Sequence, residues 1–287
     1  SFKLFCLRFV DDETFAQITH KGITGKKLDL INPKTFDEKL WWLKLNDKNP
    51  LLTICSDKVM VRNYVKDKIG ENILNEIYNI YDNVEEIDIK NLPKNFFLKC
   101  NHMSGGNLLC NDKELFDLKS AKRKLKKLLK KNYYYQSREW NYKNIVPQII
   151  CEKVLLNNDG SPLIDYRFFC FNKKCKIIVV DINTSDENGI HREDVKRNVY
   201  DNRFNLLNVK ITRENFDSTL VRKPEKLDIM IEYAEKLAEP FVQCRVDFYY
   251  VNNNIYFGEM TFYHASGNNV IFPVEFDSYL GNLIEIP

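Results

Sequence analysis

The sequence of 287 residues predicts an α+β fold with antiparallel sheets, preceded by a mainly helical N-terminal region. Strand-like segments come in pairs joined by short turns, at 165–181 and at 242–260, which favours antiparallel hairpins. Helical patterns lie outside these pairs, in the N-terminal region and at 224–239. Hydrophobic residues make up 44% of the chain and aromatic residues 13%, which is typical of a packed globular protein.

The N-terminal region carries helix signals and little strand signal. Thr35, with Glu38 three residues later, forms a capping-box pattern that predicts the start of an amphipathic helix. A second helix is expected over 53–69. Residues 77–80 fit a short strand, and 84–88 fit a turn or a short helix.

The pattern changes at 93–110, where two short apolar strands flank a loop of small residues. Phe96–Cys100 and Leu108–Cys110 are the expected strands, and 101–107 is the loop. Small residues let backbone N–H groups approach an anion, and Lys99 stands where its ammonium group could meet a phosphate. The loop matches neither a Walker P-loop nor a Rossmann fingerprint. A Gly-Gly loop between strands is more often an ordinary hairpin, so this signal is weak by itself.

Residues 119–131 predict a strongly basic helix. Eight Lys or Arg residues surround Leu125, Leu128 and Leu129. The simpler interpretation is a surface helix whose leucines pack inward. The alternative is contact with anionic lipid or with a polyanionic glycan carrier.

The second half of the chain is rich in strand patterns. A buried strand interrupted by one carboxylate is expected over 145–156, and 165–172 with 176–181 forms a hairpin. Residues 183–215 make a long polar segment that is expected to be irregular, and such segments in compact domains are often functional. A helix with apolar residues at helical spacing follows at 224–239.

The C-terminal hairpin carries the most informative side chains. Arg245 and Asp247 are two residues apart in one strand, so their side chains share a face. A tight turn through 252–254 would bring Glu259 of the second strand close to Asp247. Two carboxylates and an arginine are costly to bury together unless they hold a metal ion and a phosphate. The alternative is an ordinary amphipathic hairpin with a charged solvent face.

Composition argues against several function classes. The formal net charge is +3, from 43 basic and 40 acidic residues, which does not suggest a nucleic-acid-binding protein. No apolar run approaches the roughly 18 residues that span a bilayer. The eight cysteines lack zinc-site spacing, and most lie in apolar runs. Buried reduced thiols and a cytoplasmic location are therefore expected.

The order of these motifs resembles that of the ATP-grasp superfamily, and most closely the TupA-like ATP-grasp family found in teichuronopeptide and other surface-polysaccharide loci. The resemblance covers about residues 30–285, nearly the whole chain. The matching segments are 32–39, 56–58, 97–105, 147–152, 165–168, 245–247, 258–263 with Gly267, and 277–281.

This resemblance implies an ATP-grasp fold in which two α+β lobes with antiparallel sheets clasp ATP. The corresponding segments are an N-terminal mainly helical region at 1–90, a small lobe with the phosphate loop at 91–155 and a C-terminal lobe with the magnesium site at 156–287. The family match also implies Mg²⁺ as a second cofactor. Many ATP-grasp enzymes carry asparagine two residues after the metal-binding glutamate, whereas this chain has Thr261. The resemblance therefore leaves open whether one or two magnesium ions bind.

The resemblance also assigns site residues. Asp247 and Glu259 match the metal ligands, and Arg245 and Lys99 match the catalytic residues that act on the transferred phosphate. The residues that match nucleotide-binding positions are Lys58, Lys99, Asn101, His102, Ser104, Gly105, Gly106, Glu152, Val154, Leu155 and Arg167. The candidates for substrate binding are His191, Arg192, Arg197, Thr261 and His264.

The activity implied by the resemblance is an ATP-dependent carboxylate–amine ligase that forms an amide through an acyl-phosphate. The expected substrates are a carboxylate, such as a uronic acid or a UDP-sugar, and an amine, with possible peripheral contact to a membrane-linked glycan at the inner face of the membrane. Three rivals stay open: a kinase on the same fold, a polysaccharide-locus glycosyltransferase, and a binding module with a relict nucleotide site. The substrates and the oligomeric state do not follow from the sequence.

Overall fold

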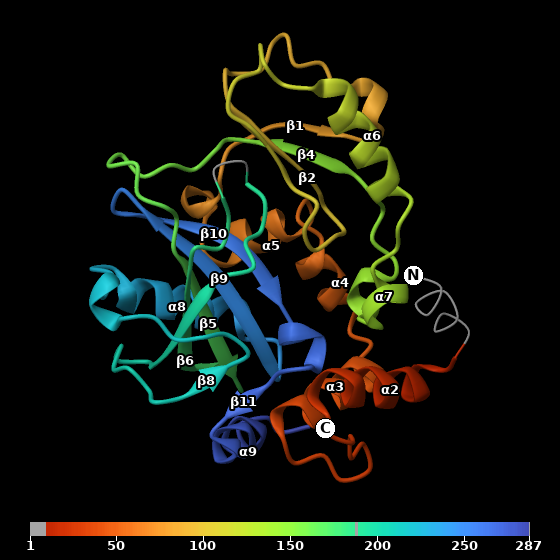
Figure 1. The fold of residues 1–287 in the computed structure, drawn as a ribbon, viewed down its shortest axis with the longest axis vertical. Coiled ribbons are helices and arrows are strands. Elements are labelled where there is room, and N and C mark those ends of the chain that lie inside the picture. Colours follow the sequence, from red (N-terminus) through yellow and green to blue (C-terminus); the bar gives the residue numbers. More distant parts are fainter. Residues whose placement is uncertain (1–9, 187–188, 287) are drawn as a thin grey trace.

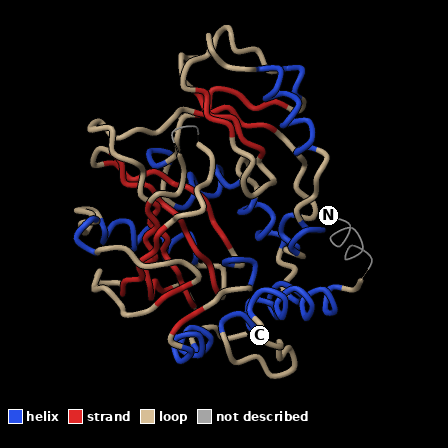
Figure 2. The backbone as a smooth tube through the Cα atoms, viewed as in Figure 1, coloured by secondary structure: helices blue, strands red, loops and turns tan. Residues whose placement is uncertain are grey.

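Two antiparallel sheets and a group of terminal helices form the molecule (Figure 1). The structure is a computed structural model that describes residues 10–186 and 189–286. Figure 2 shows the strands gathered in two sets, with helices around and between them. The smaller sheet and helix α6 lie at one end of the molecule, and helices α2, α3 and α9 lie at the other end (Figure 1). The sheets are the part of the α+β fold that positions the site.

The predicted capping box is confirmed at the start of helix α3 (Phe36–Asn46). The Thr35 hydroxyl accepts a hydrogen bond from the Glu38 backbone N–H at 3.4 Å, and the Glu38 carboxylate accepts from the Thr35 N–H at 2.9 Å. Phe36, Leu40 and other apolar residues of α3 are buried in the main core. The helix thus begins where the sequence pattern predicts it, because its orphan N–H groups are satisfied there.

Helix α2 (Asp12–Thr24) was not expected from the sequence. Asp11 caps its first turn by accepting from the Thr14 N–H at 2.8 Å, and Gly25 ends it in a left-handed conformation. These cap residues were a readable signal, since Asp or Asn before a helix and Gly after it are the common pair. Phe15 packs against Trp41 of α3, so α2 is held by a small core of its own.

The single helix expected over 53–69 was wrong, because the chain forms helix α4 (Pro50–Ser56) and helix α5 (Val61–Lys68). Asp57 interrupts them. Its carboxylate accepts from the backbone N–H two residues ahead at 2.8 Å, which favours a turn over a continued helix. The break places Lys58 between the two helices and beside the cleft described below.

The small sheet has the strand order β1-β4-β2-β3, with every neighbouring pair antiparallel. The predicted strands at 77–80, 96–100 and 108–110 are confirmed. The strand expected over 145–156 was wrong outside 149–152, since Pro147 cannot donate to a ladder and the neighbouring strands end there. The strands are β1 (Ile77–Tyr81), β2 (Phe96–Cys100), β3 (Leu108–Cys110) and β4 (Ile149–Glu152).

Helix α6 (Leu118–Leu129) covers this sheet. Leu125 and Leu128 are buried in the core of the small sheet, so the expectation that its leucines pack inward is confirmed. Lys126 lies 3.6 Å from Glu85, in the turn of 3₁₀ helix η3 (Val84–Glu86) that was expected there. A partner for the basic face of α6 stays a prediction.

The large sheet has the order β10-β9-β5-β6-β7, again with antiparallel neighbours. Both predicted hairpins are confirmed. The irregular segment expected over 183–215 was wrong in part, because it contains edge strand β7 and the short strand β8, which pairs with β11. The strands are β5 (Asp165–Phe171), β6 (Lys174–Ile182), β7 (Lys196–Asp201), β8 (Lys210–Ile211), β9 (Gln243–Val251), β10 (Asn254–Thr261) and β11 (Ile271–Phe272).

The two faces of the large sheet differ in character. Helix α8 (Leu227–Ala238), predicted from its apolar spacing, contacts β5, β6 and β9, and its Met230 and Ala234 are fully buried. The opposite face carries charged residues. The remaining elements are η2 (Glu71–Ile73), α7 (Tyr134–Ser137), η4 (Trp140–Tyr142), η5 (Ser218–Leu220), η6 (His264–Gly267) and α9 (Val274–Asn282).

The expected division at residues 90 and 155 stays a prediction, and β1 adds a strand from the first segment to the sheet of the second. The seven cysteines in the described part of the chain are buried and free, as expected, while Cys6 lies outside the described residues. In the described part of the chain, no helix combines the length and apolar composition needed to cross a bilayer.

We predict that Gly281→Ala destabilises the protein by about 1–3 kcal/mol through overpacking. A Cβ at Gly281 of α9 would lie 2.8 Å from the Thr35 carbonyl carbon and closer still to the Lys34 carbonyl oxygen, both of them backbone atoms. The matched control is Gly22→Ala in α2, where a Cβ meets nothing within 4 Å. That change should stabilise by roughly 0.5–1 kcal/mol. Urea unfolding measures both, and equal stability of Gly281→Ala and wild type would contradict the close approach.

Candidate active site

A cleft lies between the two sheets, and residues from three parts of the chain line it. Lys99 and Glu152 come from the small sheet, Glu259 comes from β10, and Lys58 comes from the break between α4 and α5. The cleft holds about 470 Å³ of empty space, which includes space open to solvent. Predicted site residues that are distant in the sequence thus meet in one place.

A β-bulge sets the position of Glu259. Phe257 pairs with Phe248, whereas Glu259 pairs with Asp247, so Gly258 is an extra residue in β10. An unbulged ladder would place residue 258 opposite Asp247 and turn Glu259 to the other face. A Cβ at Gly258 would lie 3.1 Å from the Asp247 carbonyl oxygen, so glycine suits this close approach. The bulge therefore brings the two carboxylates together.

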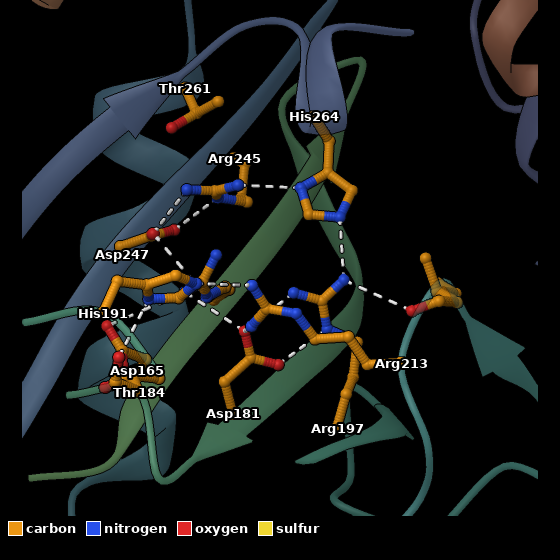
Figure 3. Close-up of polar contacts among 12 residues, drawn as sticks. Asp165, Asp181, Thr184, His191, Arg197, Arg213, Arg245, Asp247, Thr261 and His264 are labelled. Atoms are coloured by element: carbon orange, nitrogen blue, oxygen red, sulfur yellow. Dashed lines mark hydrogen bonds and ion pairs between the residues drawn. The ribbon is translucent and has the colours of Figure 1, made fainter. Parts of the chain in front are cut away.

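Arg245 joins these two carboxylates, and Figure 3 shows its contact with Asp247. Its Nε and Nη2 donate to the two carboxylate oxygens of Asp247, each at 2.7 Å, and Nη2 also donates to Glu259 Oε1 at 2.8 Å. Burial raises the pKa of Asp247 to about 6, although Arg245 and Arg167 act in the opposite direction. The pKa of Glu259 is lowered. Burial acts to raise it, but the positive charges of Arg245 and Lys58 have the larger combined effect.

The small sheet supplies a lysine–carboxylate pair on the other side of the cleft. Lys99 Nζ lies 2.6 Å from Glu152 Oε1, and both side chains are mostly buried. Lys58 Nζ donates to the Met103 carbonyl oxygen at 2.9 Å, so it tethers the loop after β2. Burial is the main cause of the lowered pKa of Lys58.

The loop at 101–107 has a rigid base and an exposed tip. Asn101 is fully buried, and its side chain donates to Asp57 Oδ1 at 3.0 Å and accepts from the Gln148 N–H at 2.7 Å. His102 is also buried, and burial lowers its pKa. Ser104 and Gly105 are exposed, while Gly106 packs closely against Leu128 of α6. The tip is therefore the part of the loop that can approach a ligand.

The charged face continues along β5, β6 and β7 beyond Asp247 (Figure 3). Asp181 is fully buried and accepts two hydrogen bonds from Arg197, at 2.6 and 2.7 Å. Arg213 Nη1 donates to Asp181 at 2.8 Å, and Arg167 Nη2 lies 3.1 Å from it. Burial acts to raise the pKa of Asp181, but the three arginines together lower it to about 2.

His264 lies between two of these arginines (Figure 3). Its Nδ1 is 2.7 Å from Arg245 Nη1, and its Nε2 is 3.1 Å from Arg197 Nη1. Burial and the neighbouring arginines hold the pKa of His264 well below its usual value, so the ring is neutral. A neutral imidazole has one acceptor nitrogen, so it accepts from one of the two guanidinium groups.

The other candidate substrate residues lie in different surroundings. Arg197 is committed to Asp181 and His264, and its side chain is 3% exposed. Arg192 is exposed and donates twice to Asp194 at 2.7 Å. Thr261 donates to Glu259 Oε1 at 3.2 Å, so its hydroxyl orients that carboxylate.

His191 is exposed and lies beside Arg213, with 3.4 Å between His191 Nε2 and Arg213 Nη2. Val154 and Leu155 are half-buried in the segment after β4. Neither of them is among the described residues that line the cleft.

The donor set fits Mg²⁺ carried with a polyphosphate. The described residues hold no group of three or more His, Cys, Asp or Glu that could bind a metal ion alone. Asp247 and Glu259 provide two carboxylates, and Mg²⁺ is commonly bound by one or two carboxylates together with phosphate oxygens and water. The residues present therefore fit a metal ion that arrives with a phosphate ligand.

Sequence reasoning did not name three members of the charged face as site residues, namely Asp165, Asp181 and Arg213. Asp181 was readable in part, because strand alternation and the 165–181 hairpin place it opposite Asp165. Arg213 follows the two-residue strand β8, so its approach to the sheet depends on tertiary contacts. Arg62 and Tyr142 also line the cleft, and no sequence motif indicated either of them.

Lys58, Lys99 and Glu259 line the cleft between the two antiparallel sheets, and Arg245 and Asp247 are hydrogen-bonded to one another beside Glu259. The sequence model of the family described as TupA-like ATPgrasp matches residues 38–285. The chain belongs to this family.

Solved structures give partial overlaps at low sequence identity. D-alanine–D-alanine ligase from Bacillus anthracis shares 16% identity over 82% of this chain and 67% of its own, with a TM-score of 0.47. L-amino acid ligase from Bacillus licheniformis shares 12% identity over 90% of this chain and 55% of its own, with a TM-score of 0.48. The chain thus spans about half to two thirds of the length of these two enzymes. Curated protein sequences give no significant match.

We predict that Asp181→Asn lowers the free energy of unfolding by about 3–5 kcal/mol, because it leaves three guanidinium groups without their shared buried carboxylate. The control is Asp194→Asn, which breaks an exposed ion pair and should change stability by less than about 1 kcal/mol. Chemical denaturation at pH 7 measures both variants.

The pH dependence of this difference follows from the lowered pKa of Asp181. An acid whose native pKa lies below its unfolded value stabilises fully above the unfolded value, here 3.8, and loses that contribution as the pH falls through about 2. The gap between wild type and Asp181→Asn should therefore be the same at pH 7 and at about pH 5. A gap that closes between those pH values would contradict the ionised state of Asp181.

Proposed function

We propose that the protein is an ATP-dependent, ADP-forming carboxylate–amine ligase. The observation that carries the proposal is that Lys58, Lys99 and Glu259 line one cleft, while Arg245 and Asp247 are hydrogen-bonded to one another beside Glu259. The three cations, together with a divalent ion on the two carboxylates, would offset the charges of a polyphosphate and of a carboxylate at the same place. Family membership over 38–285 supports the same class.

The reaction would proceed in two balanced steps. A carboxylate oxygen attacks the terminal phosphorus of ATP, which forms an acyl-phosphate and releases ADP. The amine nitrogen then attacks the acyl carbon, inorganic phosphate leaves, and the nitrogen loses a proton to give the amide. Arg245 and Lys99 would stabilise the charge on the transferred phosphoryl group, and the Ser104–Gly105 tip would limit access of water.

Asp247 and Glu259 would hold Mg²⁺ at the phosphates. The ion would act as a Lewis acid, which would neutralise phosphate charge and orient the terminal phosphate. Because Arg245 occupies both carboxylates here, metal binding would release part of its guanidinium for the substrate. Thr261 would keep the Glu259 carboxylate oriented.

The substrate class that we propose is a uronic acid, free or linked to a nucleotide, joined to an amine during capsular or surface polysaccharide synthesis. The reaction would take place in the cytoplasm. The basic face of α6 is the surface that we propose to contact a membrane-linked glycan, since its leucines are buried and its lysines and arginine point outward.

We predict that Lys99→Ala and Glu259→Gln each lower the rate of ADP release by about 100-fold or more. The first change removes a positive charge from the transferred phosphoryl group, and the second removes a carboxylate that would hold Mg²⁺. The assay crosses uronic acids and UDP-uronic acids with amino acids and amino alcohols in the presence of ATP and Mg²⁺. The controls are Lys223→Ala and Glu225→Gln, which alter exposed residues outside the cleft.

The same assay separates the rival activities. Full ADP release without an amine, together with a phosphorylated product, would support a kinase. Turnover of a sugar nucleotide without ATP would support a glycosyltransferase. Wild-type rates in both Lys99→Ala and Glu259→Gln would contradict the site.

A further inference from the structure

Three guanidinium groups converge on one buried carboxylate at the β6–β7 end of the charged face (Figure 3). Arg197 and Arg213 donate to Asp181 at 2.6–2.8 Å, and Arg167 Nη2 lies 3.1 Å from the same carboxylate. Asp165 is the next carboxylate, with its Oδ1 3.9 Å from Arg167. Asp247 lies at the same distance, 3.9 Å, from Arg167 Nε. Among the described residues, Asp181 is therefore the carboxylate within hydrogen-bonding distance of all three guanidinium groups, and their remaining N–H donors can take an additional anion.

Two of the three arginines can be reached by a ligand. The Arg197 side chain is 3% exposed, whereas that of Arg167 is 15% exposed and that of Arg213 is 25% exposed. Asp181 and His191 are the side chains that Arg213 contacts within the described residues, and a guanidinium has five N–H donors. Arg167 Nε is buried and makes no hydrogen bond to the described residues. Arg213 thus has spare donors at a partly exposed position, whereas the unpartnered Nε of Arg167 is shielded from solvent.

The backbone that carries Arg213 is held in an unfavourable conformation. Thr212 has φ +62°, a left-handed value that β-branched residues rarely adopt. Two hydrogen bonds hold it: the Thr212 N–H donates to the Val270 carbonyl at 2.7 Å, and the Val270 N–H donates to the Thr212 hydroxyl at 3.2 Å. Strain that neighbouring contacts maintain is common where a side chain must be aimed at a ligand.

His191 contacts Arg213 from a second side. Its Nδ1 lies 2.8 Å from the Thr184 carbonyl oxygen, so we assign the ring proton to Nδ1. Nε2 is then an acceptor, and it lies 3.4 Å from Arg213 Nη2. The guanidinium group is therefore contacted by the Asp181 carboxylate and by the His191 ring.

Arg167 connects this cluster to the proposed metal ligands. Its Nη2 lies 3.1 Å from Asp181, and its Nε lies 3.9 Å from Asp247. Asp181 pairs with Asp165, and Asp165 pairs with Tyr249, so the backbone positions of Asp181 and Asp247 are two strand spacings and two residues apart, about 12 Å. A molecule with its reacting carboxylate near Arg245 could extend along this face toward Arg213.

We propose that Arg213 and Arg167 form a subsite for a second anionic group, a phosphate or a carboxylate, on the acid substrate. As a statement about a substrate, this rests on the proposed ligase function. The subsite selects acids that carry a second anionic group in addition to the reacting carboxylate, such as a uronic acid linked to phosphate.

The first test measures binding of inorganic phosphate by calorimetry at low ionic strength, with Mg²⁺ and a non-hydrolysable ATP analogue in excess. Arg213→Ala should weaken phosphate binding about tenfold or more, as expected for a lost charged hydrogen bond. Arg213→Lys should give an intermediate effect, since lysine keeps the positive charge but lacks the bidentate donor geometry of a guanidinium group. The control, Arg222→Ala, removes an exposed arginine and should bind like wild type.

Two results of this test would overturn the subsite. One is equal phosphate binding by Arg213→Ala and wild type. The other is that wild type does not bind phosphate once the nucleotide analogue is present, which would indicate that the arginines bind the nucleotide itself. Arg213→Ala should fold, because Asp181 keeps Arg197 and Arg167, and thermal unfolding checks this.

The second test compares ADP release with glucuronic acid, glucuronic acid 1-phosphate and UDP-glucuronic acid. Arg213→Ala should raise KM for the two phosphate-bearing acids about tenfold or more relative to KM for glucuronic acid. An equal rise for all three acids would indicate a structural role and overturn the proposal. Arg213-dependent phosphate binding without ADP release from any acid would uphold the anion site and count against the ligase.

Discussion

Charge balance on one face of the large sheet is the constraint on which the site depends. Four arginines face four carboxylates there, and each charge is held by at least one partner within 4 Å. Burying any of them alone would be costly, so the pairing fixes the side chains in one arrangement. The charged residues on this face are Arg167, Arg197, Arg213, Arg245, Asp165, Asp181, Asp247 and Glu259.

The same balance makes the face responsive to ligands. A divalent ion on Asp247 and Glu259 would add two positive charges and compete with Arg245 for its partners. The face would then favour anions at Arg245 and at the Asp181 cluster together. A polyphosphate and an acid with two anionic groups are ligands of that kind, which links the proposed reaction to the proposed subsite.

Helix α3 of the N-terminal region contacts the segment that carries His264. Lys44 of α3 donates to the Ser266 carbonyl at 2.7 Å, and Asp37 accepts two hydrogen bonds from Asn269, both at 2.6 Å. These contacts hold the turn η6, in which Ala265 and Ser266 have positive φ. Because His264 begins this turn and contacts two of the arginines, α3 contributes to the geometry of the charged face.

Strand alternation and helix capping are local properties, so the sequence alone predicts the hairpins, the capped helix α3 and the shared face of Arg245 and Asp247. Other features depend on contacts between distant segments, which local patterns do not contain. The Gly258 bulge turned Glu259 to the Asp247 face, and the Asp57 turn split a predicted helix and moved Lys58 into the cleft. Arg213 joined Asp181 only through the pairing of β8 with β11, since long-range contacts and not neighbours in sequence set its direction.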